Sequence, residues 1–384
     1  MDNLSATISI LGDLIAFPTI SPDSNLDMIA YLAERLEHTG ARVDIYHDET
    51  GKKTNLFATL GPDVHGGIVL SGHTDVVPVA DQFWSSEPFE MDHRDDKLFG
   101  RGTCDMKGFI AAALAMAPVF AERVGERPVH FAFTYDEETG CFGAQALVDQ
   151  LQKMGVRPSV ALIGEPTSMR VIEGHKGCYE YSTHFTGLAG HGSAPDLGVN
   201  AVEYAALYVA RLLHLKAALR DRAPEGSRFE PPWTTISVGA LHGGVAHNVI
   251  PPRATVDWDM RPVQKSDADF VKSDLLRYCD EELLPAMRAI SDDAEIMTEV
   301  IAEVEGLEPT TENEARDIFM ELTGANGAGL VAFGTEAGLF QTLGLSAVVC
   351  GPGSIEQAHK ADEYVAIDQL SQCVGMLERL SARI

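Results

Sequence analysis

Histidine and carboxylate side chains follow several short apolar runs of this sequence, at the points where strands are expected to end. These residues are His73, Asp75, Asp105, Glu137, Glu138, Glu165 and His359. In open α/β sheets, functional groups gather beyond the carboxyl ends of the strands. Burying five carboxylates and two imidazoles together is costly unless a cation lies among them. The pattern therefore predicts two divalent metal ions. Mixed His and carboxylate ligands suit Zn²⁺, with Co²⁺ or Mn²⁺ as alternatives.

Strand and helix signals alternate along the first half of the chain, between these residues. Apolar runs and periodicity predict strands at 41–47, 54–60, 67–71, 129–135 and 160–163, and helices at 25–38 and 109–123. Alternation of this kind is typical of an α/β sheet with helices on both faces. The first half is therefore expected to form a metal-binding α/β domain.

A different pattern begins near residue 178. Strands are expected at 178–186, 234–240 and 254–260, and long helices at 199–219 and 266–290. Their order is typical of a small ferredoxin-like α+β domain. Strand and helix signals of the α/β kind return after about residue 293. We therefore expect a catalytic domain of residues 1–177 and 293–384 and an inserted domain of residues 178–292.

Composition limits the classes of partner. The 384 residues include 57 acidic and 29 basic side chains, which gives a net charge of −28. Such a charge repels nucleic acid and anionic membrane surfaces, so we expect neither as a partner. The acidic surface either attracts a cationic substrate or simply maintains solubility.

Cysteine usage and the N-terminal residues indicate a cytoplasmic protein. The six cysteines form no CxxC pair, so reduced thiols are expected. Asp2 and Asp13 do not fit a signal peptide. The longest apolar stretch, residues 109–121, is too short to span a bilayer.

Four motifs are specific in combination: SGHTDVVP from Ser71, GRGTCDMKG from Gly100, DEETG from Asp136 and GEPT from Gly164. Together they resemble the co-catalytic zinc aminoacylase and carboxypeptidase family, which includes acetylornithine deacetylase, succinyl-diaminopimelate desuccinylase and glutamate carboxypeptidase. The resemblance covers nearly the whole chain. It implies a zinc-exopeptidase-like catalytic domain, an inserted lid and dimerisation domain, and a homodimer.

The resemblance also implies a role for each metal-type residue. Asp105 is expected to bridge the two ions. His73 and Glu165 would complete one metal site, and Glu138 and His359 would complete the other. The peptide bond after Asp105 is expected to be cis.

Two further carboxylates are assigned by the same resemblance. Asp75 would orient the imidazole of His73. Glu137, beside a metal ligand, would act as general base on the water that bridges the ions. The alternative for Glu137 is an ordinary surface glutamate.

The assignments for substrate contacts are less specific. His191 resembles the histidine of the inserted domain that stabilises the oxyanion in relatives, sometimes across a dimer; the alternative is a turn histidine. Asn248 and Arg261 match positions that hold the substrate carboxylate, although Arg261 could instead form a strand-end ion pair. Gly353 lies in a segment that could offer backbone N–H groups, or form a tight turn.

Three local features favour acetylornithine deacetylase within the family: HKG from His175, GTEAG from Gly334, and GPGS from Gly351 leading to QAHK. The expected reaction is hydrolysis of N-acetyl-L-ornithine to L-ornithine and acetate. Glu336 is expected near the δ-amino group of ornithine, or to orient the loop that contacts it. The alternatives are a related hydrolase of another N-acyl amino acid or a dipeptide and, more remotely, a non-catalytic binding protein on the same fold.

Overall fold

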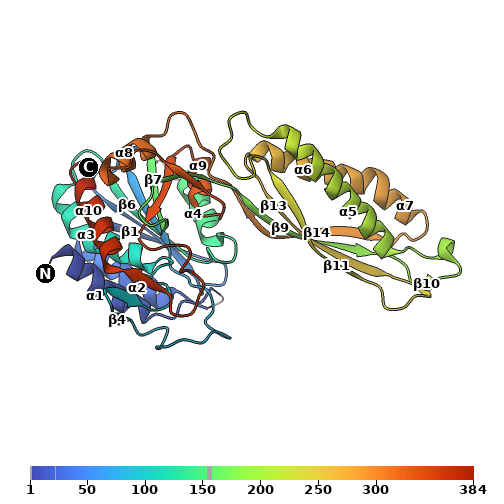
Figure 1. Ribbon diagram of the computed structural model, residues 1–384, viewed down its shortest axis with the longest axis horizontal. Helices are drawn as coiled ribbons and strands as arrows, with labels where there is room; N and C mark the ends of the chain where they lie inside the picture. The colour runs from blue at the N-terminus through green and yellow to red at the C-terminus, as the bar shows by residue number, and fades with distance from the viewer. Residues whose placement is uncertain (1, 22, 154–157) are drawn as a thin grey trace. The chain divides into compact units, whose positions relative to one another are not determined.

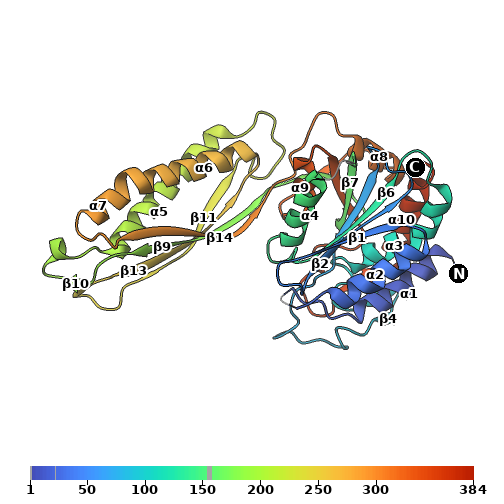
Figure 2. The same cartoon turned by 180° about the vertical axis from the view of Figure 1, so that it is seen from behind.

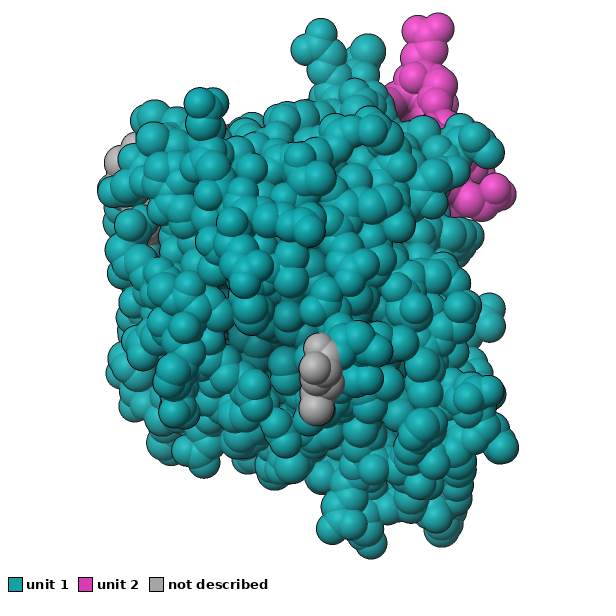
Figure 3. Space-filling model, turned by 90° about the vertical axis from the view of Figure 1, so that its left-hand side faces the viewer, with its two compact units in different colours: residues 1–174, 309–330, 335–384 teal, residues 175–308, 331–334 magenta. Residues whose placement is uncertain are grey.

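The chain divides into two compact units. The computed structural model describes residues 2–21, 23–153 and 158–384. Unit 1 contains residues 1–174, 309–330 and 335–384, and unit 2 contains residues 175–308 and 331–334 (Figure 3). An inserted unit was expected, but its second boundary falls at residue 308 rather than at 292. The difference arises because residues 295–304 form a strand of the unit 2 sheet.

Unit 1 is built on an eight-stranded sheet. In spatial order its strands are β1 (Arg42–His47), β2 (Thr54–Leu60), β6 (Val129–Thr134), β3 (Ile68–His73), β7 (Val160–Pro166), β16 (Ser346–Gly351), β8 (Ile172–His175) and β15 (Gly329–Val331). The central strands β6, β3, β7 and β16 are parallel, whereas β1, β2 and β8 pair antiparallel with their neighbours. Strands β2, β3, β6 and β7 are buried along their whole length, as expected where both faces are covered.

Helices cover both faces of this sheet (Figure 1). One face shares a hydrophobic core with α1 (Asn3–Ile15), α2 (Leu26–His38), α3 (Lys107–Arg123), α8 (Glu314–Thr323) and α10 (Ile367–Leu380). That core uses alternate residues of the strands, so the intervening residues point to the opposite face. There α4 (Phe142–Lys153) and α9 (Ala337–Thr342) contact each other and the sheet. Among the described helices, none has the length and hydropathy required to cross a bilayer.

A small three-stranded sheet brings the C-terminal region to the loop before α3. Its order is β17 (Tyr364–Ala366), β5 (Lys97–Phe99), β4 (Asp92–Arg94). Tyr364 lies opposite Phe99, and the Gly100 N–H donates to the Glu363 carbonyl oxygen at 3.0 Å. Residues near 360 are thereby held beside residues near 100.

Unit 2 has the ferredoxin-like arrangement that the order of its elements predicts. Its antiparallel sheet has the order β11 (Thr235–Gly243), β13 (Arg253–Arg261), β9 (Cys178–Thr186), β14 (Glu295–Val304). Helices α5 (Ala201–Ala218) and α6 (Lys265–Tyr278) lie along one face (Figure 2). The helix expected at 266–290 is divided by a π-helical turn, Cys279–Leu283, before α7 (Leu284–Arg288). Short elements complete the unit: β10 (Gly190–His191), β12 (Val249–Ile250) and the 3₁₀ turns Pro195–Leu197 and Leu219–Arg222.

Candidate active site

Four metal-type residues lie at the carboxyl ends of neighbouring parallel strands in unit 1. His73 is the last residue of β3, Glu137 and Glu138 follow β6, and Glu165 is the penultimate residue of β7. Strand β3 pairs in parallel with both β6 and β7. The three strand ends therefore meet at one edge of the sheet, as the sequence pattern predicted.

Asp105 lies between two imidazoles, in the loop that leads into α3. Its Oδ1 is 3.0 Å from Nε2 of His73, and its Oδ2 is 3.5 Å from Nε2 of His359. The peptide bond between Asp105 and Met106 is cis, as expected. The same Nε2 of His359 lies 3.0 Å from Oε2 of Glu138. Each oxygen of Asp105 thus faces a different histidine.

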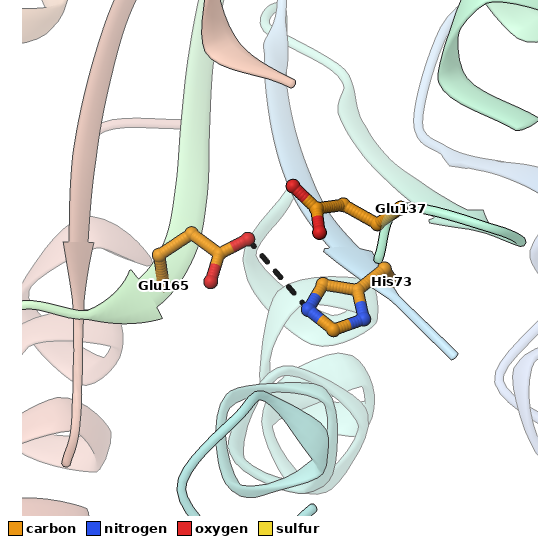
Figure 4. A group of neighbouring side chains, drawn as sticks. All are labelled: His73, Glu137 and Glu165. Atoms are coloured by element: carbon orange, nitrogen blue, oxygen red, sulfur yellow. Dashed lines mark ion pairs between the residues drawn. The ribbon is translucent and has the colours of Figure 1, made fainter. Parts of the chain in front are cut away.

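The remaining side chains close the cluster from the β7 side. Figure 4 shows His73, Glu137 and Glu165 pointing toward one another, with 3.7 Å between His73 Nε2 and Glu165 Oε1. Their ligand atoms lie within 4.8 Å of one another, and so do those of His73, Asp105 and Glu138. The structure therefore brings all five expected ligands together with Glu137.

The Glu165 carboxylate shows that this cluster suits a cation. Glu165 is buried, and its Oε1 accepts no hydrogen bond from the part of the chain that the structure describes. An unsatisfied buried carboxylate oxygen is costly, and a metal ion removes that cost. Oxygen and imidazole donors at these separations fit a pair of divalent ions.

Protonation equilibria reflect the crowding of negative charge. Burial, followed by the charge of Asp105, raises the pKa of Glu165 well above its usual value. Burial also raises the pKa of Glu137 to about 8. Hydrogen bonds to Asp105 and Glu138 raise the pKa of His359 to about 10. Without bound cations, the cluster thus retains protons that metal ions would displace.

Asp75 has a wider role than the sequence indicated. Nδ1 of His73 lies 2.9 Å from the backbone carbonyl oxygen of Asp75 and 3.5 Å from its Oδ1, so both groups of Asp75 face this imidazole. The Asp75 carboxylate also accepts the backbone N–H groups of Glu137 at 3.1 Å and Glu138 at 3.2 Å, and the hydroxyl of Ser21 at 2.8 Å. Asp75 therefore fixes the backbone of the general-base candidate and of one ligand candidate.

Two residues near the cluster were missed by sequence reasoning. Arg101 and Glu363 form a buried ion pair beside Asp105. Arg101 lies within the GRGTCDMKG motif, which was a usable signal. Glu363 carried no local signal, because only the pairing of β17 with β5 brings it to this loop.

Glu336 lies deeper than expected. Its side chain is fully buried and accepts hydrogen bonds from the hydroxyls of Ser71, on β3, and Thr134, on β6, the latter at 2.9 Å. Both carboxylate oxygens are thus occupied by strand-end hydroxyls. This placement does not support a contact with the δ-amino group of a substrate; it supports a role in fixing the strand ends beneath His73.

The unit 2 residues fall into two places. His191 and Asn248 are exposed neighbours, because β10 pairs with β12 and the Gly192 N–H donates to the Asn248 carbonyl oxygen at 2.8 Å. Arg261 ends β13, where it pairs with Glu180 at 3.2 Å and with Asp259. The structure therefore groups His191 with Asn248, and shows Arg261 in the strand-end ion pair that was its alternative.

Gly353 occupies a tight turn. Its φ of 92° favours glycine, and a Cβ there would lie 2.6 Å from Sγ of Cys104. Its N–H donates to Oε1 of Gln369 at 2.6 Å. Because that N–H is engaged, the geometry favours the turn over a contact with substrate.

Comparison with known proteins identifies the family. Residues 69–383 match the model of peptidase family M20/M25/M40. The chain belongs to this family. It is 35% identical over 371 residues to acetylornithine deacetylase of Klebsiella pneumoniae, covering 95% of this chain and 94% of that protein. It is 36% identical over 389 residues to acetylornithine deacetylase of Myxococcus xanthus, covering 99% and 98%.

Solved structures share the fold. A metallo-carboxypeptidase of the M20 family from Sulfolobus solfataricus superimposes with a TM-score of 0.73 at 17% identity, covering 100% of this chain and 99% of that one. A Bacillus subtilis protein described as a dinuclear metal-binding peptidase of the M20 family gives 0.65 at 16% identity, with 99% and 98% coverage. Family membership together with the full-length relatives makes the chain a metallohydrolase that acts on amide bonds.

Proposed function

We propose that this M20 family hydrolase cleaves N-acetyl-L-ornithine to L-ornithine and acetate, using two divalent metal ions, of which Zn²⁺ fits best and Co²⁺ is the alternative. The observation that carries the chemistry is the buried Asp105 carboxylate, whose two oxygens face His73 and His359 at 3.0 and 3.5 Å. The substrate is supported by the two relatives named acetylornithine deacetylase at 35% and 36% identity over nearly the full chain.

Five residues would hold the ions. We define the inner site as His73, Asp105 and Glu165, and the outer site as Asp105, Glu138 and His359. Their donor types suit zinc, and the 3.7 Å between His73 and Glu165 and the 3.0 Å between His359 and Glu138 are short enough for one ion to be shared within each pair.

Glu137 is the proposed general base. When bound, a metal pair polarises the scissile carbonyl and lowers the pKa of the attacking water. Glu137 takes one proton from that water and delivers it to the nitrogen of the departing amine, so the proton is conserved over the reaction.

Unit 2 supports a homodimer in this proposal. His191 and Asn248 lie beyond the start of β13, whereas Arg261 ends it. From Arg253 to Arg261, β13 advances eight residue steps, or about 26 Å, which is longer than a small N-acyl amino acid. One substrate therefore cannot touch both places on one copy of unit 2. We propose that His191 serves the oxyanion and Asn248 the substrate carboxylate in the partner subunit of a homodimer, whereas Arg261 stays in its ion pair with Glu180.

A substrate panel tests the proposal. Purified protein loaded with zinc or cobalt is given N-acetyl-L-ornithine, N-acetyl-norvaline, N-succinyl-diaminopimelate and dipeptides at matched concentrations, and free amine is measured. We expect the largest kcat/KM for N-acetyl-L-ornithine. A larger value for a dipeptide or for a different N-acyl amino acid would replace the substrate while leaving the metallohydrolase chemistry intact.

A further inference from the structure

A buried ion pair outside the set of metal ligands joins two loops that carry them. Nη1 of Arg101 lies 2.7 Å from Oε2 of Glu363, and each side chain is only 1% exposed. The desolvation cost of such a pair is large, so the pair by itself is weak support for stability. Its remaining contacts indicate what it does.

The Glu363 carboxylate holds the loop that ends at Asp105. Its Oε1 accepts the backbone N–H groups of Gly102 at 3.1 Å, Cys104 at 2.9 Å and Asp105 at 3.0 Å. Hydrogen bonds to an ionised acceptor are about twice as strong as neutral ones. Three of them on one oxygen fix the backbone from which the Asp105 side chain projects.

The guanidinium of Arg101 extends the same anchor to the loop of His359. Nη1 donates to the carbonyl oxygen of Lys360 at 3.3 Å, and Nη2 donates to Oε1 of Gln82 at 2.7 Å. Nε2 of Gln82 in turn donates to the carbonyl oxygen of His359 at 2.9 Å. Arg101 therefore holds the carbonyl oxygen of Lys360 directly and that of His359 through Gln82.

The two metal sites depend unequally on this anchor. The inner site takes His73 and Glu165 from paired strands of the central sheet, whose backbone the strand pairing fixes. The outer site takes His359 from a loop, and this side chain is 51% exposed. Only Asp105 is shared. Loss of the anchor should therefore move the outer ligands more than the inner ones.

We propose that Arg101 is a positioning residue that sets the affinity of the outer site for its metal ion, with little effect on the inner site. This inference rests on the two-metal function proposed above. The requirement is for the guanidinium fork and not only for its charge. A lysine could pair with Glu363, but its single nitrogen cannot also reach Gln82 and Lys360.

The test is metal titration of Arg101→Lys. Metal-free protein is titrated with Co²⁺ and followed by calorimetry and by the visible absorption of the bound ion. Wild-type protein should take up two equivalents. In the variant, the first equivalent should bind as in the wild type and the second should bind about 10- to 100-fold more weakly, the usual effect of losing support behind a ligand. Anomalous diffraction from crystals with one equivalent should place that ion at the inner site.

Arg316→Lys is the matched control. Arg316 also pairs with a largely buried carboxylate, Glu173 at 3.0 Å, and donates to the carbonyl oxygens of Thr310 and Thr311, each at 3.0 Å. No residue of the metal cluster takes part in those bonds. This control should bind both equivalents as the wild type does.

The outcomes separate the inference from the proposed function. If the wild-type protein fails to bind two ions, the two-metal function is wrong. If it binds two ions and Arg101→Lys matches it, or Arg316→Lys weakens binding equally, only the role of Arg101 is overturned. Should Arg101→Lys fail to fold, Gln82→Ala removes the link to His359 from a partly exposed residue. It should weaken the second equivalent, and unchanged binding would also overturn the inference.

Discussion

Glu137 is fixed through its backbone, which leaves its carboxylate directed into the cluster. The backbone N–H donates to Asp75, and the carboxylate accepts a weak thiol hydrogen bond from Cys141 at 3.4 Å. Figure 4 shows the carboxylate facing His73 and Glu165. A group held in this way can move a proton without having to leave a strong partner.

The substitution Glu137→Gln tests that role. It keeps the size and polarity of the side chain but cannot accept a proton, so kcat should fall by about 10²- to 10⁴-fold. Metal stoichiometry, measured by elemental analysis, should stay at the wild-type value because the proposed ligands are intact. The exposed Glu126→Gln serves as a control with unchanged kcat. Near-normal turnover in the Glu137 variant would assign the base elsewhere.

Motifs at the predicted strand ends were enough to find the residues of the metal cluster. The residues that support the cluster could be only partly predicted from the sequence. His73, Glu137 and Glu165 stand next to apolar runs, so local patterns sufficed to find them. Glu363 supports Asp105 through bonds between residues 258 to 261 positions apart. Such long-range contacts leave no local periodicity to read. Glu336 shows the converse, because its motif was visible but its burial was not.

At the level of elements, strand β6 contains a buried titratable residue away from the metal cluster. His130 is 2% exposed. Its Nδ1 lies 2.9 Å from the hydroxyl oxygen of Thr59, and its ring stacks on Phe57. Burial lowers the pKa of His130 to about 4. The folded protein therefore holds this imidazole neutral where an unfolded chain, with a pKa near 6.5, takes up a proton.

The pH dependence of stability follows from that shift. Above pH 6.5 both states are neutral at this residue, so the full stability is present. As the pH falls from about 6.5 to about 4, only the unfolded state gains a proton, and about 3 kcal/mol of unfolding free energy is lost. The unfolding free energy, measured by urea denaturation at several pH values in this range, should fall less steeply with decreasing pH for His130→Gln than for wild type. Equal slopes in the two proteins would contradict the assignment.

Element prediction succeeded where periodicity was clean and failed where it was not. Strands 54–60 and 178–186 were placed with their exact bounds, because the apolar pattern ends at turn residues. Strand β14 was missed, because its outward positions carry exposed apolar side chains, Met297 and Val300 among them, and no alternation is visible. Because β14 was missed, the inserted domain was expected to end at residue 292, whereas in the structure it extends to residue 308.

At the level of the whole molecule, the proposed assembly places residues of two subunits in each active site. Its basis is that His191 lies with Asn248 at the small β10–β12 sheet, whereas Arg261 ends β13 of the four-stranded sheet of unit 2. The order of strands in that sheet was predictable from the order of elements. The distance between the substrate-binding candidates was not predictable, because each was found by a similar motif match and such a match does not indicate where a residue lies in the fold.

Complementation between two inactive variants tests this assembly. His191→Ala and Glu137→Gln are co-expressed with different tags, and the mixed dimer is isolated. If His191 serves the partner's site, each mixed dimer contains one complete site of two, so the isolated mixed dimer should show about half of wild-type activity. If His191 serves its own chain, both sites of the mixed dimer stay defective and no activity returns.

Metal removal and add-back test whether hydrolysis depends on two bound metal ions. The protein is treated with chelator, dialysed, and titrated with Zn²⁺ or Co²⁺ while ornithine release from N-acetyl-L-ornithine is followed. We predict that activity disappears on chelation and returns as metal is added back, reaching its maximum at two equivalents per chain. Full activity in protein shown by elemental analysis to be metal-free would contradict the account.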